Sequence, residues 1–371
     1  MRIAQVAPLY ESVPPRQYGG TERVVSYLTE ELVRLGHEVT LFASGDSETS
    51  ARLVPACATS LWNDAETRDV LAHHVRLVGL VFEDVSRFDV IHFHSDLMHF
   101  PLLRYCPCRT VTTIHGRLYG HDLEALFRQF ADVPLVSISD YQRRPVPHAN
   151  WQRTVYHGIP RNLYKFHQGP GEYLAFLGRT SPEKRLDRAI EIARAARMPL
   201  KIAARIDPVD QEYYKKEIEP LMHEAREYVE FVGQIGDKEK DAFLGNARAM
   251  LFPIDWPEPF GLVMAESLAC GTPVIAWRNG SAPEVIDDGE TGFVVESIED
   301  AVAAVGRLDE IDRAVCRRTF EARFCSTRMA LDYVDVYKRL QPSWSEAPAR
   351  TASAADMAAQ LDIPACPSEV I

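Results

Sequence analysis

Residues 252–266 read FPIDWPEPFGLVMAE. Four apolar residues ending at Phe252 predict the last part of a buried strand, which a proline terminates. Two further prolines remove backbone donors and exclude regular structure from the middle of the stretch. From Leu262 the apolar residues recur at helical spacing, and Gly271 is a C-terminal stop signal. The stretch therefore predicts a strand, a rigid loop and a helix, in that order.

Two carboxylates flank the start of this helix, with Glu258 in the loop and Glu266 inside the helix. The backbone N–H groups of Phe260, Gly261 and Leu262 point out of the helix start, and such an end binds phosphate through free donors and the helix dipole. Carboxylate oxygens grip vicinal hydroxyls, so one can hold a sugar and the other a ribose. The pattern suits a nucleotide sugar, although a solvated acidic loop and a solvated helical glutamate have the same spacing.

The segment from Glu258 to Glu266 resembles the E-x7-E motif of family-4 retaining glycosyltransferases of the GT-B fold. The resemblance covers roughly residues 1–340. It implies an α/β fold in which two Rossmann-like domains face each other across a cleft, and a C-terminal helix crosses back to the first domain. The expected limits are 1–165 for the N-terminal acceptor domain, 166–325 for the nucleotide-sugar donor domain, 326–340 for the crossover helix and 341–371 for a disordered tail.

The N-terminal segment has the order of a Rossmann-like half. A buried strand at residues 2–7 leads into a loop containing Gly19 and Gly20, and Thr21 is expected to cap the helix that follows. The segment lacks G-x-G-x-x-G, so a dinucleotide fingerprint is absent. The glycine pair resembles the one through which the family's first domain approaches the donor diphosphate.

Histidines gather in the first half of the chain. His92 and His94 share one face of a predicted strand, and His99 follows, but no cysteine or carboxylate cluster completes a metal-ligand set. We therefore predict no metal site. His115 ends another strand, where α/β folds bind ligands. The resemblance implies that His115 contacts the donor sugar.

The second domain begins with a strand followed by residues 178–185, GRTSPEKR. This segment closely resembles the family signature G-R-x-x-P-E-K-G, with Arg185 where glycine is usual. Arg179 and Lys184, both expected in loops, can neutralise a diphosphate. Further on, Gly233 and Ile235 stand where the family stacks and reads the nucleobase.

Composition limits the other classes of function. The 371 residues are 46% hydrophobic and 25% charged, which is typical of a soluble globular enzyme. The net charge of −12 gives no basic field for nucleic acid. Seven scattered cysteines favour reduced thiols, and the sequence has neither a signal peptide nor a membrane span, so we expect a cytoplasmic protein.

The resemblance implies a retaining hexosyltransferase that moves a hexosyl group, most simply glucosyl from UDP-glucose, to a hydroxyl of a small molecule or glycan. It implies roles for His115, Glu258, Arg179 and Lys184 in catalysis, by front-face attack without a metal or other cofactor. Donor binding is expected from the glycines, the helix start and the second glutamate: Gly19, Gly20, Gly233, Ile235, Phe260, Gly261, Leu262 and Glu266.

The acceptor is left open by the sequence. Tyr10, Tyr18 and Tyr119 lie in loops expected to line its site and can stack on a flat molecule or a sugar. The N-terminal pattern AQVAPLYESVPPRxYGGTERVVSYL also resembles bacterial UDP-glucose:tetrahydrobiopterin glucosyltransferases. A reduced pterin is therefore the alternative acceptor.

Three other classes share parts of this pattern. A non-hydrolysing sugar-nucleotide epimerase has the same fold, but it needs carboxylate acid and base residues and does not resemble the E-x7-E pattern. A phosphorylase needs a lysine-bound pyridoxal phosphate, and no lysine here lies in a recognisable site for it. A non-catalytic sugar-nucleotide-binding protein usually loses the counterpart of His115 or Glu258, and both are present.

Overall fold

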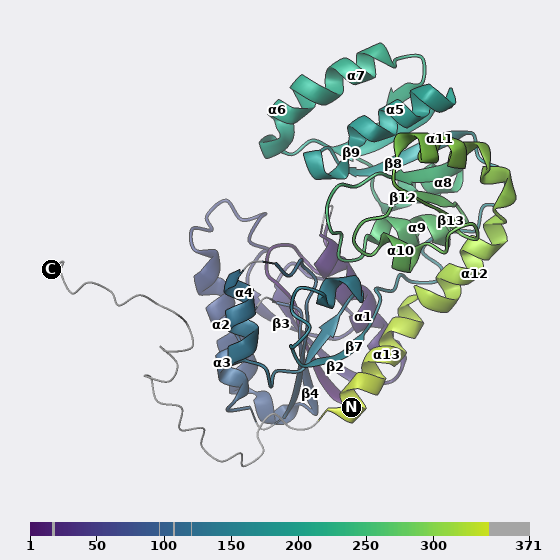
Figure 1. The fold of residues 1–371 in the computed structure, drawn as a ribbon. Helices are drawn as coiled ribbons and strands as arrows, with labels where there is room; N and C mark the ends of the chain where they lie inside the picture. Colours follow the sequence, from purple (N-terminus) through teal and green to yellow (C-terminus); the bar gives the residue numbers. More distant parts are fainter. Residues whose placement is uncertain (17–18, 96, 107, 120, 341–371) are drawn as a thin grey trace.

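The computed structural model describes residues 1–16, 19–95, 97–106, 108–119 and 121–340 of the chain. The predictions made for Tyr18 and for the tail 341–371 lie outside these residues. The described chain forms two α/β lobes that stack one above the other (Figure 1). This arrangement confirms the predicted pair of Rossmann-like domains.

The first domain is built on a seven-stranded parallel sheet of order β3-β2-β1-β4-β5-β6-β7. Its strands are β1 (Arg2–Val6), β2 (Glu38–Ser44), β3 (Arg52–Cys57), β4 (Val90–Phe93), β5 (Arg109–Thr113), β6 (Leu135–Ser137) and β7 (Trp151–Thr154). Its helices are α1 (Gly20–Arg34), α2 (Val70–Glu83), α3 (Phe100–Leu103) and α4 (His121–Gln129).

The second domain has a six-stranded parallel sheet of order β10-β9-β8-β11-β12-β13. Its strands are β8 (Tyr173–Arg179), β9 (Leu200–Arg205), β10 (Val229–Phe231), β11 (Ala247–Phe252), β12 (Val274–Trp277) and β13 (Gly292–Val295). Its helices are α5 (Leu186–Ala196), α6 (Gln211–Tyr213), α7 (Glu219–Glu224), α8 (Asp237–Gly245), α9 (Leu262–Ala269), α10 (Ala282–Val285), α11 (Ile298–Gly306) and α12 (Arg313–Arg323).

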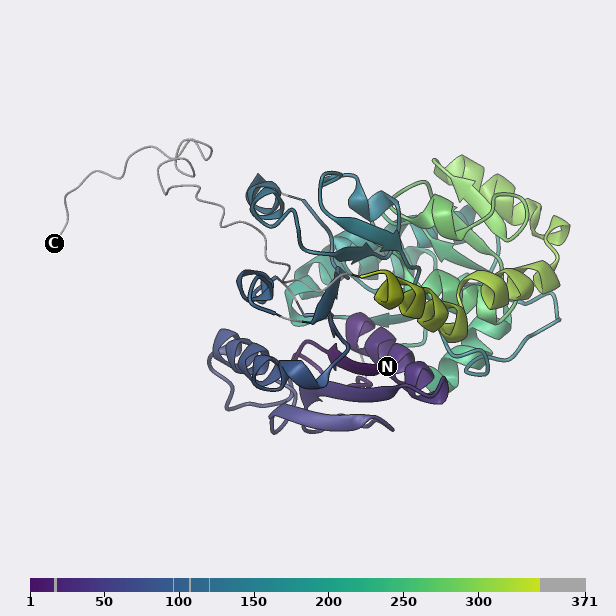
Figure 2. The ribbon, with the colours of Figure 1, turned by 90° about the horizontal axis from the view of Figure 1, so that it is seen from below.

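The last helix, α13 (Ser326–Arg339), lies against the first domain beside α1, as predicted (Figure 2). Its residues Met329, Tyr333 and Tyr337 are buried in the same apolar cluster as Ile3 and Val24. Because this cluster contains side chains from both ends of the chain, the crossover helix completes the core of the first domain.

Two strands of the first sheet are not marked by an apolar run in the sequence. β3 and β7 are its edge strands, and β3 contains Pro55 while β7 carries the polar residues Gln152 and Arg153. An edge strand has one free side and can include proline and charge, so it lacks the apolar run that identifies a central parallel strand.

The charged amphipathic pattern over residues 210–226 predicts a helix, and the structure is helical from Gln211 to Glu224, with one irregularity. A π-helical turn at Tyr214–Ile218 separates α6 from α7. Pro220 stands at the start of α7 and has no N–H to donate to the preceding turn, and this loss accounts for the irregular winding before it.

The chain crosses between the domains twice, once between β7 and β8 and once between α12 and α13. The crossings are joined, because Ile159 N–H donates to the carbonyl of Phe324 at 2.9 Å and Ser326 N–H donates to the carbonyl of Ile159 at 2.9 Å. A Cβ at Gly158 would lie 2.5 Å from the carbonyl oxygen of Cys325, so only glycine permits this approach. Within the described ranges, no helix is long and apolar enough to cross a membrane.

Candidate functional site

A cavity of about 220 Å³ lies between the two domains, and we call it the interdomain cavity. It brings together eight residues that the sequence analysis selected from both halves of the chain. These are Gly19, Gly20, Arg179, Lys184, Glu258, Gly261, Leu262 and Glu266.

Two helix N-termini meet at the interdomain cavity. α1 begins at Gly20, one residue before the predicted cap Thr21, and α9 begins at Leu262. A Cβ built on Gly20 would stand 3.9 Å from Leu262 Cδ1, so the two helix starts face each other across the cleft. Gly261 has φ +76°, and a Cβ there would lie 2.7 Å from the Met264 side chain, so this turn requires glycine. Converging helix N-termini favour an anion such as a diphosphate.

Glu258 is held by two donors that share its Oε2 atom. Lys184 Nζ donates at 2.6 Å and the indole N–H of Trp256 donates at 2.8 Å. Lys184 also lies 4.7 Å from the centre of the Trp256 ring, which is a cation–π distance. A diphosphate that binds Lys184 must therefore share this cation with Glu258.

The loop that carries Glu258 is supported by the segment at Gly280 and Ser281. A Cβ at Gly280 would lie 2.3 Å from the backbone nitrogen of Glu258. Ser281 N–H donates to the carbonyl of Glu258 at 2.9 Å, and its hydroxyl donates to the carbonyl of Phe260 at 2.8 Å. The small residues of this segment therefore fix the position of the Glu258 loop.

Arg179 is the last residue of β8, so the prediction that it lies in a loop is wrong. Its guanidinium faces three carboxylates: Glu183 at 2.7 Å, Asp210 at 3.2 Å and Asp207 at 3.8 Å. Since these carboxylates offset its charge, Arg179 contributes less positive potential to the cavity than the sequence signature suggests.

Glu266 is 3% exposed on α9 and has partners from distant parts of the chain. Lys240 Nζ donates to both carboxylate oxygens, at 2.9 and 3.2 Å, and the Tyr164 hydroxyl donates to Oε1 at 3.1 Å. Arg23 from α1 also lines the cavity and pairs with Asp237 of α8. No sequence pattern links these residues to Glu266, because they meet only through the fold.

Three of the expected donor-binding residues do not line either of the two cavities described in this section. Gly233 and Ile235 lie in the loop between β10 and α8. Phe260 is 2% exposed, and its ring packs 5.0 Å from the ring of His157. The Phe260 side chain therefore belongs to the packing between the domains.

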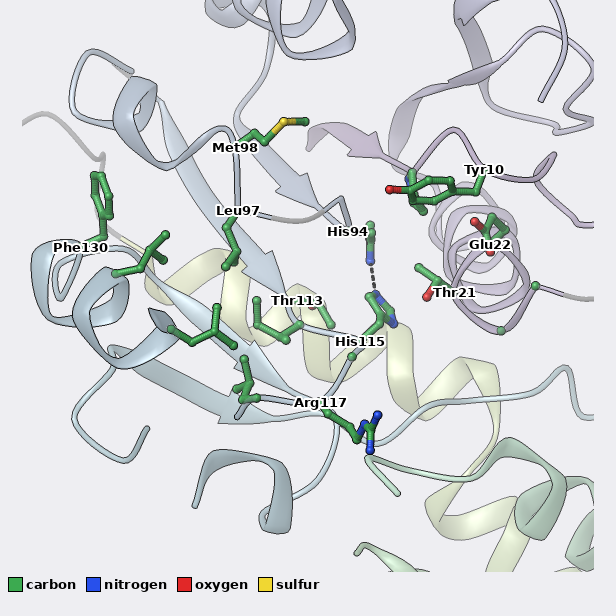
Figure 3. A pocket seen from close by; sticks show the side chains of 18 of the residues that line it. Tyr10, Thr21, Glu22, His94, Leu97, Met98, Thr113, His115, Arg117 and Phe130 are labelled. Carbon is green, nitrogen blue, oxygen red and sulfur yellow. Dashed lines mark hydrogen bonds between the residues drawn. The ribbon is translucent and has the colours of Figure 1, made fainter. Parts of the chain in front are cut away.

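His115 lines a second cavity, of about 840 Å³, which we call the first-domain cavity (Figure 3). Gly19 and Gly20 line both cavities, so the two adjoin at the start of α1. The remaining lining residues are Pro8, Tyr10, Thr21, Glu22, Trp62, His94, Leu97, Met98, Pro101, Thr113, Ile114, Gly116, Arg117, Leu118, Leu123, Leu126 and Phe130.

A chain of hydrogen bonds leads from α13 to His115. Gln5 donates from Nε2 to the Tyr337 hydroxyl at 3.1 Å and accepts at Oε1 from His94 Nε2 at 2.7 Å. His94 Nδ1 therefore accepts from His115 Nε2, at 2.9 Å. With its proton on Nε2, His115 carries a lone pair on Nδ1.

The imidazole of His115 is neutral near pH 7. Burial lowers its pKa from 6.5 to about 3, because the charged form loses its hydration. Its Nδ1 is buried without a hydrogen-bond partner among the described residues, and its ring stacks on His157 at 5.2 Å. His115 can therefore accept a hydrogen bond from a substrate hydroxyl.

His92 of β4 and His99, which follows this strand, have hydrogen-bond partners that are not metal ligands. His92 accepts from the Tyr337 hydroxyl at 2.7 Å and bonds the Thr113 hydroxyl at 2.7 Å, while His99 bonds Thr112 at 2.7 Å. In the part of the chain that the structure describes, no group of three His, Cys, Asp or Glu side chains could hold a metal ion.

Five buried histidines are expected to lower the free energy of unfolding in acid. Burial lowers the pKa of all five (92, 94, 99, 115 and 157), so below pH 6.5 the unfolded chain binds protons that the native chain does not. Each can cost up to about 1.4 kcal/mol of unfolding free energy per pH unit. Glu22 and Asp210 act oppositely, since burial raises the pKa of Glu22 to about 7 and also raises that of Asp210, but they are fewer than the histidines.

We therefore expect the urea midpoint to fall steadily between pH 7.5 and pH 5. Equilibrium unfolding followed by circular dichroism at several pH values measures it. A midpoint that stays flat or rises over this interval would contradict the assignment of neutral buried histidines.

Arg185, at the position where the family has glycine, takes a left-handed backbone with φ 53°. Its guanidinium donates to Asp187, at 2.7 Å for the shortest bond, and to Asp255 at 2.9 Å. The backbone thus keeps the shape that glycine adopts easily, and the ion pairs offset a conformational cost of about 1 kcal/mol.

Comparison with known proteins assigns each domain to a family. Residues 18–162 match the family described as "Glycosyltransferase Family 4", and residues 165–313 match "Glycosyl transferases group 1". Glycogen synthase of Mycobacterium tuberculosis is 28% identical over 87% of this chain and 89% of its own length. An uncharacterised 41.2 kDa protein from the cps region of Klebsiella pneumoniae is 31% identical over 44% of this chain, and the match spans 46% of that protein.

Solved structures agree on the fold. AviGT4, a glycosyltransferase involved in avilamycin A biosynthesis, superposes with a TM-score of 0.67 at 23% identity, covering 91% of this chain and 97% of its own. The Anabaena protein HepE in complex with UDP gives a TM-score of 0.70 at 17% identity, covering 91% and 100%. The two domain matches support a family-4-like glycosyltransferase, and the solved structures show the GT-B fold.

Proposed function

We propose that this protein is a retaining hexosyltransferase that moves glucosyl from UDP-glucose to a hydroxyl acceptor. The observation that carries the proposal is the interdomain cavity, where the two glutamates of the E-x7-E pattern, Lys184 and two helix N-termini meet. The choice of donor is supported by HepE, whose solved structures include complexes with UDP and with UDP-glucose.

Each residue then has a role in transfer. Glu258 orients hydroxyls of the transferred sugar, and Glu266 accepts from the ribose. Departure of the diphosphate builds negative charge, which Lys184, Arg179 and the helix starts stabilise. His115 accepts from a substrate hydroxyl through Nδ1. Front-face attack keeps the anomeric configuration without a covalent intermediate.

Incubation of the protein with UDP-glucose and an acceptor mixture tests the proposal. We expect release of UDP together with acceptors that are heavier by one hexosyl residue in mass spectrometry. Tight UDP binding with no product from any nucleotide sugar would favour the alternative of a non-catalytic sugar-nucleotide-binding protein.

We expect activity without a metal or other cofactor, since the cations assigned to the leaving diphosphate are side chains and helix ends. EDTA at millimolar concentration should leave most of the transferase rate intact. Loss of the rate on chelation, with recovery when Mn²⁺ is added, would remove the electrostatic role from Lys184 and Arg179.

A reduced pterin is the second acceptor candidate. Tyr10 and Trp62 lie with ring centres 5.3 Å apart in the wall of the first-domain cavity, and Glu22 lines the same cavity. An aromatic wall can stack on a flat heterocycle, and a carboxyl group can pair with its amino group. Transfer from UDP-glucose to tetrahydrobiopterin, followed by mass spectrometry, tests this acceptor. We place the reaction in the cytoplasm, where UDP-sugars and reduced thiols occur together.

A further inference from the structure

The first-domain cavity has two chemically different ends. In Figure 3, Tyr10, Thr21, Glu22, His94 and His115 gather at one end. This polar end adjoins the interdomain cavity, because Gly19 and Gly20 line both. A hydroxyl that receives the sugar must lie here, beside the donor.

The opposite end is apolar. Leu97, Met98 and Phe130 are labelled there in Figure 3, and Leu123 and Leu126 of α4 belong to the same lining. The leucines of α4 are half-buried, so their side chains are partly covered by protein and partly open. Apolar surface that a ligand removes from water contributes roughly 25 cal/mol per Å² to binding.

From this polarity we infer that the acceptor is a small amphipathic molecule with a neutral hydroxyl-bearing head and an apolar body. The head lies at the polar end and the body lies against Leu97, Met98 and α4. The inference rests on the proposed function, whose donor site it does not alter.

The size and lining of the cavity argue against a glycan. A volume of about 840 Å³ can enclose a whole small molecule. A bound oligosaccharide would leave many hydroxyls against the hydrocarbon of the far end, and an unpaired buried polar group costs about 1–3 kcal/mol. A pterin is a polar heterocycle and offers little hydrocarbon to the apolar end.

The charges of the lining argue for a neutral head. Arg117 is the one cation among the described lining residues, and its guanidinium is stacked 3.9 Å from the Trp256 ring. Glu22 is 5% exposed, and burial raises the pKa of its carboxyl to about 7, while His115 is a neutral imidazole whose Nδ1 has no hydrogen-bond partner among the described residues. Carboxyl and imidazole groups of this kind pair with hydroxyls, and the one cation of the described lining is already engaged with an aromatic ring.

A ladder of 4-alkylphenols, from methyl to pentyl, tests the inference by calorimetry in the presence of UDP. Each methylene that is buried at the apolar end should lower Kd about 4-fold. The pentyl member should bind more tightly than maltotriose and tetrahydrobiopterin, and UDP-glucose should convert it to a phenyl glucoside.

Matched leucine variants locate the body of the ligand. In Leu126→Ser, Kd should no longer fall with each added methylene. In Leu331→Ser, at an exposed position of α13 outside both cavities, Kd should still fall about 4-fold for each methylene. Thermal unfolding of each variant confirms that it is folded, and Met98→Ser replaces Leu126→Ser if that variant is not.

The outcomes separate the inference from the proposed function. The amphipathic acceptor alone is overturned if the protein binds UDP but its Kd for the alkylphenols does not change with chain length. It is also overturned if maltotriose or tetrahydrobiopterin binds more tightly than pentylphenol. A steep ladder that Leu126→Ser and Met98→Ser leave unchanged also overturns it, because the phenols then bind elsewhere. Absence of UDP binding overturns the proposed function, and the acceptor role with it.

Discussion

Replacing Lys184 by alanine is expected to lower kcat by about 10²-fold or more, the size of effect seen when a preorganised donor to developing charge is lost. Lys184 lines the interdomain cavity and lies 2.6 Å from Glu258 Oε2. The variant therefore loses a cation for the leaving diphosphate and also one of the two donors that hold Glu258. Steady-state kinetics with saturating UDP-glucose measure the effect.

Lys238→Ala is the matched control, because Lys238 is exposed and lies outside the cavity. It should retain the wild-type rate. Lys184→Ala with unchanged kcat would exclude this lysine from the site. Arg179→Ala should also lower kcat, but it leaves Glu183, Asp207 and Asp210 without their shared cation, so its thermal stability should fall as well. Lys184→Ala is therefore the clearer test, because its effect on kcat is not mixed with the loss of stability expected for Arg179→Ala.

The two glutamates should fail differently when each is replaced by glutamine. In the role proposed for Glu258, Glu258→Gln would lose charge-assisted hydrogen bonds to hydroxyls beside the reacting carbon, so the loss should fall mainly on kcat. In the role proposed for Glu266, Glu266→Gln would weaken a ribose contact that is similar in ground and transition states, so it should raise the KM for the donor. The expected loss in binding is about 1–3 kcal/mol.

Calorimetry with UDP alone separates the two roles. Glu266→Gln should bind UDP more weakly, whereas Glu258→Gln should bind it almost normally. Glu266 is also the partner of Lys240 and Tyr164, so unfolding of Glu266→Gln must be measured beside that of Glu299→Gln, an exposed helical position. Equal losses of UDP affinity, or losses in the reverse order, would end this division of labour.

The sequence predicted the parts of the site that are local in the chain. The loop of Glu258, the helix start at Leu262 and the glutamate at 266 lie within one short stretch, whose prolines and helical period dictate its structure. The buried central strands could also be predicted, because apolar runs are typical of parallel sheets that are covered on both faces.

Other parts of the site could not be predicted, because they depend on contacts between residues that are distant in the sequence. Lys240 and Tyr164 reach Glu266 over 26 and 102 residues, and no spacing rule connects them. His94 and Gln5 looked like core residues, yet their hydrogen bonds decide which nitrogen of His115 is free. The polarity of the first-domain cavity likewise comes from α4, which the sequence analysis did not assign.

The paired crossings at Ile159 and Cys325 determine how the two lobes can move. Two separate connections would let the domains slide, twist and rock independently. Because these two segments are hydrogen-bonded to each other, they form one connection between the domains, and this is where a hinge for domain closure would lie. Since α13 is buried against the first domain, it would move together with that domain. A rotation of the second domain about this connection would separate the start of α1 from the start of α9. The angle between the domains would then control how the donor enters and leaves the interdomain cavity.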